Sequence, residues 1–152
     1  IAQFITDNGI WNSAVISLGG NVKTIGKKNN SFFKIGLENP NGSDYLGVVR
    51  VMNGKSVVTS GNYQRYYVVN GKKYCHIIDP DTLMPADYFS SVTVIGDDSL
   101  YCDEMSTYLF CLPVEEGMKI VNSDSNIEAM WCDKNGKLTY SDRFEDYLIE
   151  QH

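Results

Sequence analysis

The chain has 152 residues, of which 43% are hydrophobic and 21% are charged. This composition is ordinary for a globular protein, so we expect a single domain over residues 1–152 and exclude a disordered chain. The net charge of −6 and the lack of a basic cluster exclude a nucleic-acid partner. No apolar run approaches the roughly 20 residues that cross a bilayer.

The first 60 residues carry a repeated pattern of short apolar runs and turn residues. A helix over residues 1–8 is expected to end at Gly9, because glycine readily takes the left-handed conformation that terminates helices. The runs that follow predict strands over residues 13–18, 22–25, 32–37, 45–52 and 55–59. Asn53-Gly54, between the last two strands, is a strong hairpin signal.

A second hairpin is expected around Asn70-Gly71. Its first arm opens with the small residues 60–62, and its second arm ends at Asp79-Pro80, where proline stops a strand. This arrangement puts Arg65 and His76 near strand ends, which are favoured positions for ligand contact. Four tyrosines are expected to pack across the strands, or to offer one ring to a flat ligand: Tyr63, Tyr66, Tyr67 and Tyr74.

The last 60 residues mix helices and strands. After an irregular segment, a strand is predicted over residues 91–95, and the clearest helix covers residues 100–112, between N-cap residues 97–99 and Pro113. Its expected apolar face consists of Tyr101, Met105, Tyr108, Leu109 and Leu112. Further predicted elements are a helix over residues 115–122, strands over 127–132 and 138–140, and a strand or helix over 144–149.

Many antiparallel hairpins followed by helices predict an α+β fold with a mainly antiparallel sheet and helices packed on it. The sequence has no glycine-rich dinucleotide fingerprint and no P-loop. Its four cysteines form no C-x-x-C pair, which argues against structural zinc. Cys102 and Cys111 are too far apart on one predicted helix to bond each other, so we expect free and mostly buried thiols.

Two residues on the main helix could share a metal ion. Asp103 and Thr107 are four residues apart, so they project from the same side of the helix. A carboxylate and a hydroxyl in this geometry could hold Mg²⁺ together with phosphate oxygens. The alternative is that Asp103 favours the helix dipole and that Thr107 has no role beyond its place in the helix.

Other residues have two interpretations each. His76 is either a hydrogen-bonded structural residue or a general base, and Arg65 either binds phosphate or pairs with Asp79 or another carboxylate. Gly19-Gly20 makes either a tight turn or a close backbone approach to a ligand.

The combination of these segments resembles the ApbE family, the FAD:protein FMN transferases. Five motifs occur in the family's order and with family-like spacing: Ile16–Asn21, Thr59–Tyr66, His76–Thr82, Ser91–Val94 and Asp103–Thr107. The likeness extends from about Ile1 to Phe144 and identifies the chain as the C-terminal portion of an ApbE-like domain.

The resemblance implies Mg²⁺-dependent transfer of FMN from FAD to a threonine or serine hydroxyl of an acceptor protein, with release of AMP. Typical acceptors are subunits of membrane electron-transport complexes. It also implies an extracytoplasmic protein that is anchored to the membrane by a lipid. The sequence in hand shows no signal segment, so a cytoplasmic location is the alternative. Two other functions stay open: a truncated flavin-binding remnant without transferase activity, and an FAD pyrophosphatase that yields FMN and AMP.

The resemblance also assigns roles to individual residues. Asp103 and Thr107 match the metal ligands, and His76 matches the residue that helps to deprotonate the acceptor. Residues in loops near the flavin nucleotide, or in motif positions that shape the site, are Gly19, Gly20, Asn21, Ser60, Gly61, Asn62, Arg65 and Asp79.

The chain departs from the family at two places. Leu83 follows Thr82 where the family motif has glycine. The family's N-terminal half, which supplies nucleotide contacts and a metal ligand, is not in this sequence. We therefore expect an N-terminally truncated domain, for which partial folding, self-association and loss of activity are the open outcomes.

Overall fold

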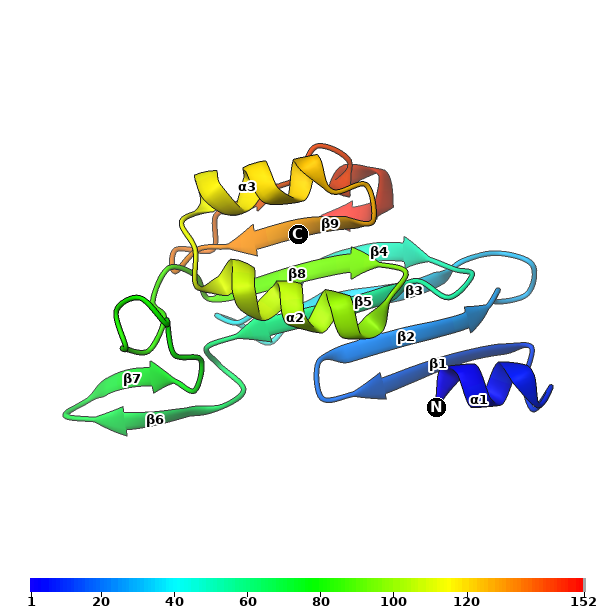
Figure 1. Cartoon of the computed structure of the whole chain (residues 1–152), viewed down its shortest axis with the longest axis horizontal. Helices are drawn as coiled ribbons and strands as arrows, with labels where there is room; N and C mark the ends of the chain where they lie inside the picture. The colour runs from blue at the N-terminus through cyan, green and yellow to red at the C-terminus, as the bar shows by residue number, and fades with distance from the viewer. Residues whose placement is uncertain (152) are drawn as a thin grey trace.

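A six-stranded antiparallel sheet forms the middle layer of the computed structural model, which describes residues 1–151 (Figure 1). The strand order is β1-β2-β5-β8-β9-β10. The bounds are β1 Ser13–Leu18, β2 Asn21–Gly26, β5 Ser56–Gly61, β8 Ser91–Gly96, β9 Ile127–Cys132 and β10 Leu138–Tyr140. Every neighbouring pair is antiparallel, so the predicted α+β class with a mainly antiparallel sheet is confirmed.

Both faces of the central strands β5, β8 and β9 are covered, whereas β1 is mostly exposed (Figure 1). Helices α2 (Ser99–Phe110) and α3 (Val114–Ser123) lie on one face. A second sheet of β3 (Phe33–Glu38), β4 (Tyr45–Val51) and β11 (Leu148–Gln151) lies on the other. All six residues of β8 and all six of β9 are consequently buried.

Side-chain alternation along the strands supplies both cores. Val58 of β5 lies opposite Val94 of β8, and both contribute to the core under the helices. Their neighbours Val57 and Ile95 also pair, and they contribute to the core against the second sheet. Because successive side chains in a strand point to opposite faces, a single run of apolar residues fills two layers.

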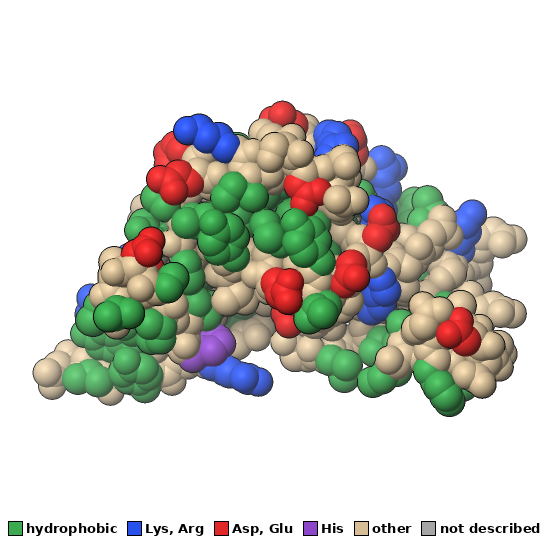
Figure 2. All heavy atoms as spheres, viewed as in Figure 1, with side chains coloured by type: hydrophobic (Ala, Val, Ile, Leu, Met, Phe, Trp, Pro, Cys, Tyr) green, Lys and Arg blue, Asp and Glu red, His purple; other side chains and the backbone are tan. Residues whose placement is uncertain are grey.

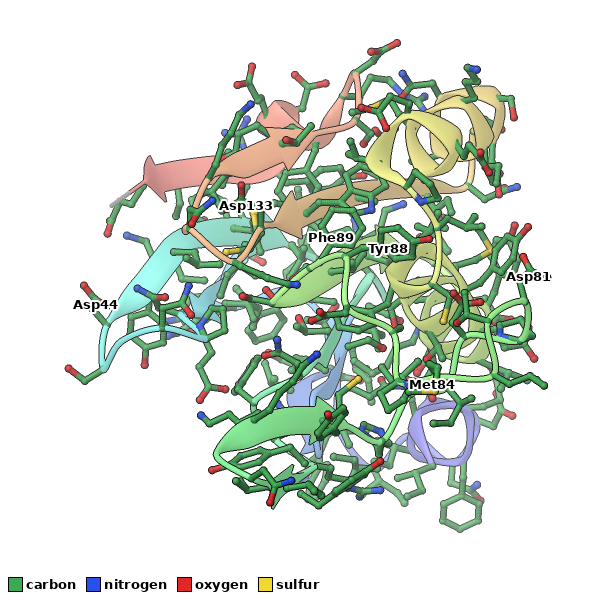
Figure 3. The ribbon with its side chains drawn as sticks, turned by 90° about the vertical axis from the view of Figure 1, so that its left-hand side faces the viewer. Asp44, Asp81, Met84, Tyr88, Phe89 and Asp133 are labelled. Atoms are coloured by element: carbon green, nitrogen blue, oxygen red, sulfur yellow. The ribbon has the colours of Figure 1, made fainter. Side chains whose placement is uncertain are left out.

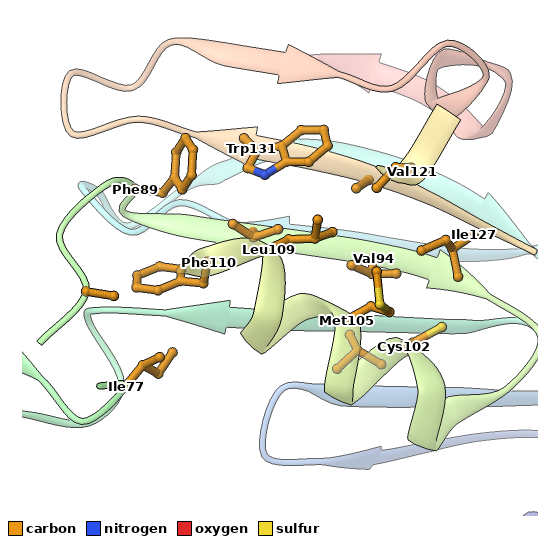
Figure 4. Packing of buried hydrophobic residues seen from close by; sticks show 14 of the residues in the cluster. Ile77, Phe89, Val94, Cys102, Met105, Leu109, Phe110, Val121, Ile127 and Trp131 are labelled. Atoms are coloured by element: carbon orange, nitrogen blue, oxygen red, sulfur yellow. The ribbon is translucent and has the colours of Figure 1, made fainter. Parts of the chain in front are cut away.

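The face of α2 that packs on the sheet differs from the predicted one. Met105 and Leu109 are buried as expected, but Tyr101 and Tyr108 are exposed. The buried face is completed by Cys102, Ser106 and Phe110. Figure 4 shows Cys102 and Phe110 in the core beneath the helix. The prediction failed because it favoured large apolar tyrosines over small residues, whereas the sheet lies close enough that Cys102 and Ser106 fit beneath the helix.

The N-terminal helix α1 (Ala2–Asp7) ends near Gly9, as expected. Residues 144–149, which fitted either a strand or a helix, contain both the 3₁₀ helix η1 (Phe144–Tyr147) and the start of β11. The four cysteines are free, and three of them are buried. None of the helices within residues 1–151 combines the length and apolarity needed to cross a membrane.

The hairpin of β6 (Tyr66–Val69) and β7 (Lys72–Cys75) forms a separate two-stranded sheet that projects from the molecule (Figure 1). Asn70 has a φ angle of 50°, and the strands on either side of Asn70-Gly71 pair with each other, so the hairpin predicted there is confirmed. Asn53 has a φ angle of 54°, but β4 and β5 pair with other strands and lie in different sheets, so the turn at Asn53-Gly54 is not the predicted hairpin. Two boundaries differ from the prediction. Residues 60–61 end β5 instead of opening a turn, and β7 stops at Cys75, so His76 lies just beyond the strand.

Candidate functional site

A cleft of about 560 Å³ lies at the base of the β6–β7 hairpin, beside α2. Most of the predicted site residues line it, although they come from four distant parts of the sequence. These residues are Gly19, Ser60, Gly61, Arg65, His76, Asp103 and Thr107. The sheet brings Gly19 close to Ser60 and Gly61. This is because β2 and β5 are antiparallel, so the β1–β2 turn and the C-terminal end of β5 lie at the same end of the sheet.

Hydroxyl groups connect the end of β5 to α2 in the wall of the cleft, where Ser60 and Thr107 line it and Ser106 is fully buried. Ser60 Oγ lies 2.8 Å from Ser106 Oγ and 3.2 Å from Thr107 Oγ1. Ser106 and Thr107 both donate hydrogen bonds to the backbone carbonyl of Asp103, at 3.0 and 3.2 Å. This network fixes the turn of α2 that presents Asp103 and Thr107, and Thr107 Oγ1 keeps lone pairs for a further partner.

The carboxylate of Asp103 is exposed, and no residue among 1–151 hydrogen-bonds or ion-pairs with it. The described residues contain no group of three or more His, Cys, Asp or Glu side chains that could hold a metal by themselves. One free carboxylate beside a hydroxyl nevertheless suits Mg²⁺, which usually takes one or two carboxylates and completes its shell with phosphate oxygens and water.

His76 faces the cleft with one ring nitrogen already engaged. Its backbone amide donates to the carbonyl of Arg65 at 3.2 Å, and its Nδ1 lies 3.2 Å from the same oxygen. Since a carbonyl can only accept, this contact favours the tautomer with the proton on Nδ1. The other nitrogen, Nε2, is then an acceptor that can take a proton from a substrate.

Arg65 also lines the cleft, and its guanidinium forms no ion pair in the part of the chain that the structure describes. The predicted alternative of a pair with Asp79 is therefore absent. An unpaired guanidinium has five donors in a planar fork that matches phosphate oxygens.

Gly20 and Asn21 do not line this cleft, although Asn21 lines a second cavity. Gly20 has a φ of +90°, and a Cβ there would come within 3.1 Å of the Thr59 carbonyl. Glycine is needed for this close passage between the β1–β2 turn and β5. Asn21 accepts a hydrogen bond from Ser99 Oγ at 2.8 Å, which ties the turn to the start of α2.

Asn62 and Asp79 order loops beside the cleft. The backbone amide of Asn62 donates a hydrogen bond to the backbone carbonyl of Ser90 at 3.0 Å. Asp79 is only 5% exposed, and it accepts a hydrogen bond from the backbone amide of Asp81 at 2.9 Å. This bond holds the pKa of the Asp79 carboxyl below its usual value. The two residues therefore position the loop that follows the hairpin, on which Figure 3 labels Asp81 and Met84.

Two residues that the sequence analysis left without a role also contribute to the site. Gln64 lines the cleft next to Arg65. Ser106, which is fully buried, bonds Ser60 and thereby fixes the position of the Asp103–Thr107 turn. No local signal in the sequence gives this contact, because Ser60 and Ser106 are 46 residues apart.

A second cavity of about 660 Å³ adjoins the cleft. Gly19 and Asp103 line both spaces. The second cavity adds apolar side chains from β1 and α2, namely Ile16, Leu18 and Leu100. The site thus offers polar groups around Asp103 and an apolar surface next to it, which suits a ligand with a charged centre and a flat ring.

Comparisons with known proteins show which family this chain resembles. The model described as "ApbE family" matches residues 1–131. An FAD:protein FMN transferase of Klebsiella pneumoniae strain 342 is 41% identical over 131 residues, which are 84% of this chain and 40% of that protein.

Two solved structures are also similar. The ApbE protein of Thermotoga maritima superposes with a TM-score of 0.83 at 31% identity, covering 91% of this chain and 45% of that one. The apo form of the Pseudomonas stutzeri flavinyl transferase ApbE gives a TM-score of 0.74 at 27% identity, with coverage of 96% and 47%. The chain spans less than half the length of these relatives. By sequence and by fold, it belongs to the ApbE family.

Proposed function

We propose that this chain carries the catalytic residues of an FAD:protein FMN transferase, which moves FMN from FAD to a threonine or serine hydroxyl of an acceptor protein and releases AMP. One observation supports this most directly. The free carboxylate of Asp103 and the hydroxyl of Thr107, both on α2, line the same cleft as His76, which follows β7. The names of the similar proteins support the same activity.

The diphosphate of FAD would lie between α2 and Arg65. Asp103 and Thr107 would hold Mg²⁺, which when bound neutralises charge on the diphosphate. The Arg65 guanidinium would bind phosphate oxygens through its planar fork. Gly19 leaves room for the nucleotide, because it lines the cleft without a side chain and a Cβ there would stand in open space.

His76 would act on the acceptor. Its Nε2 takes the proton from the acceptor hydroxyl, whose oxygen then forms a bond to the FMN phosphorus. The bond between that phosphorus and the bridging oxygen breaks, and AMP leaves with the bridging oxygen. The hydrogen bond from Nδ1 to the Arg65 carbonyl keeps the ring oriented and stabilises the charge that His76 gains.

Transfer can be tested in the natural full-length protein with FAD, Mg²⁺ and an acceptor protein, followed by in-gel flavin fluorescence. We expect covalently fluorescent acceptor, and we expect Asp103→Asn to abolish the signal. Asp142→Asn is the matched control, because Asp142 is exposed and lies outside the cleft. Undiminished labelling by Asp103→Asn would refute the metal assignment.

A second variant separates chemistry from binding. His76→Ala should lower transfer by about 10²–10⁴-fold, the usual contribution of a general base, with little change in FAD affinity. Equal losses of affinity and rate would instead indicate a structural role for His76. Free FMN and AMP without a labelled acceptor would favour the pyrophosphatase, and binding without either product would favour the flavin-binding remnant.

The acceptor and the location are further parts of the proposal. We propose that the acceptor is a subunit of a membrane electron-transport complex and that transfer takes place outside the cytoplasm. Cell fractionation of the full-length protein, with detection of flavin-labelled proteins in the same fraction, tests both statements. Recovery of the protein and its labelled acceptor in the cytoplasm would contradict them.

A further inference from the structure

The β6–β7 hairpin exposes an unusual amount of apolar surface. All four residues of β6 are 45–56% exposed, although each is a tyrosine or a valine. In Figure 1 the strand lies at the outer margin of the molecule, with β7 as its only partner in the sheet. An isolated two-stranded sheet is marginally stable in water, and contiguous exposed apolar surface commonly marks an interaction site.

The hairpin also has the opposite charge from the rest of the chain. Residues 65–78 contain three Lys or Arg residues and none of the 19 Asp and Glu residues, in a chain of net charge −6. Within the described residues, none of these three cations forms an ion pair. Their charge is therefore available to a partner that carries carboxylates.

Two contacts hold the lysines at the hairpin surface. Lys72 Nζ lies 5.2 Å from the centre of the Tyr74 ring, and Lys73 Nζ lies 4.7 Å from that of Tyr66. Tyr67 stacks on Tyr74 at 5.5 Å. These cation–π and stacking contacts restrain the long lysine side chains before a partner binds. Binding therefore costs less side-chain entropy than it would for free lysines.

The base of the hairpin is a wall of the candidate site. Arg65 precedes β6, His76 follows β7, and a backbone hydrogen bond of 3.2 Å joins them where both line the cleft. Figure 2 shows the described histidine, in purple, between a Lys or Arg side chain and the apolar side chains at the hairpin end of the molecule. A polypeptide lying along the hairpin would thus reach His76.

We propose that the β6–β7 hairpin docks the acceptor polypeptide, and that it selects a segment with carboxylates within about four residues of the reactive hydroxyl. The four residues of β6, at about 3.3 Å each, set this reach. The tyrosines and valines contact the segment, and Lys72 and Lys73 pair with its carboxylates. This inference rests on the proposed transferase function and names the kind of acceptor that the site takes.

An anionic membrane is a weaker match to this surface. Membrane recognition by charge usually needs clusters of four to eight basic residues, whereas the two strands and their turn contain two lysines. The tip of the hairpin is Asn70-Gly71, which is polar, and the apolar residues lie along the strand instead. The observations therefore favour a polypeptide.

Peptide binding tests the proposal without any transfer reaction. Two fluorescein-labelled peptides of equal length would carry one threonine, flanked by glutamates in one and by lysines in the other, and fluorescence anisotropy would report their binding to the full-length protein. We expect the acidic peptide to bind at least about tenfold more tightly, which two to three exposed ion pairs can supply. The preference should weaken as salt is added.

Charge reversal locates the surface. Lys72→Glu combined with Lys73→Glu should remove or reverse the preference between the two peptides. Lys27→Glu combined with Lys28→Glu is the matched control, because these exposed lysines lie in another turn, and it should keep the wild-type preference. Circular dichroism confirms that both double variants are folded.

Three results would overturn the docking proposal. They are no binding of either peptide, equal binding of both, and an unchanged preference in the hairpin variant. Loss of binding to phosphatidylserine vesicles in the hairpin variant, without any peptide preference in the wild type, would assign the hairpin to a membrane instead. A peptide preference in a protein that transfers no flavin would keep the docking surface and refute the transferase.

Discussion

Leu83 has a backbone conformation that its side chain disfavours. Its φ is +57°, in the left-handed region, and its side chain is 77% exposed. The loop imposes this conformation, since the Leu83 amide donates to the Asp79 carbonyl at 2.9 Å and the Asp79 amide donates to the Met84 carbonyl at 2.9 Å. Glycine, the residue that the resemblance implies at this position, takes a positive φ without strain.

Leu83→Gly should therefore stabilise the protein. The left-handed conformation costs a non-glycine residue about 1–2 kcal/mol, and the extra freedom of glycine in the unfolded chain costs about 0.4–1 kcal/mol. Little burial is lost, because Leu83 is mostly exposed. From the middle of each range, the balance is about 0.8 kcal/mol in favour of glycine, which raises the melting temperature by about 2–3 °C for a chain of this length.

Thermal unfolding followed by circular dichroism measures the effect. Met84→Gly is the control, because Met84 is the exposed neighbour in the same loop and is not among the described residues with positive φ. It should lose about 0.4–1 kcal/mol through the unfolded-state term alone. If Leu83→Gly destabilises the protein as much as Met84→Gly, the conformation of Leu83 is not strained and the reasoning fails.

Three further predictions concern side chains that order the site. Asp98 caps α2 by accepting hydrogen bonds from two amides of its first turn at 2.8 and 3.1 Å, so Asp98→Ala should cost about 1 kcal/mol in urea unfolding, and Asp142→Ala almost nothing. The lowered pKa of Asp79 means that its carboxylate stabilises the fold above about pH 4 and that this contribution is lost as the pH falls further. Asp79→Asn should thus reduce the difference in melting temperature between pH 7 and pH 3, and an unchanged difference would contradict the loop-ordering role. Ser60→Ala removes the hydroxyl that bonds Ser106, and it should raise the Mg²⁺ concentration needed for half-maximal flavin transfer more than it lowers the rate at saturating Mg²⁺.

Local signals in the sequence were enough to predict most individual elements. The Asn70-Gly71 turn has the positive φ angles of the hairpin it was predicted to make, and Asp98 caps the main helix from within the predicted N-cap segment. These features depend on a few adjacent residues, so a single sequence contains them. At Asn53-Gly54 the turn forms with positive φ angles, but the strands beside it go to different sheets, which the two residues do not encode. The residues that line the cleft were found through the order of the family motifs, because spacing alone left each with a second interpretation.

Long-range features were beyond the sequence. Nothing in residues 33–51 shows that this hairpin leaves the main sheet and pairs with β11 near the end of the chain. The small buried residues of α2 were missed because Ser106 is polar, and its inward position depends on Ser60, which is 46 residues away. Strand partners and helix faces are decided by such contacts, which periodicity does not encode.

The two walls of the cleft differ in how firmly they are held, and this difference fits two-substrate chemistry. Asp103 and Thr107 lie on α2, whose Met105 and Leu109 are buried against the six-stranded sheet (Figure 4). The opposite wall is the base of a two-stranded hairpin that is mostly exposed. Phosphoryl transfer needs precise placement of the diphosphate, which a packed helix supplies. An acceptor protein must enter and leave, and a hairpin with few buried contacts can adjust to it at low cost.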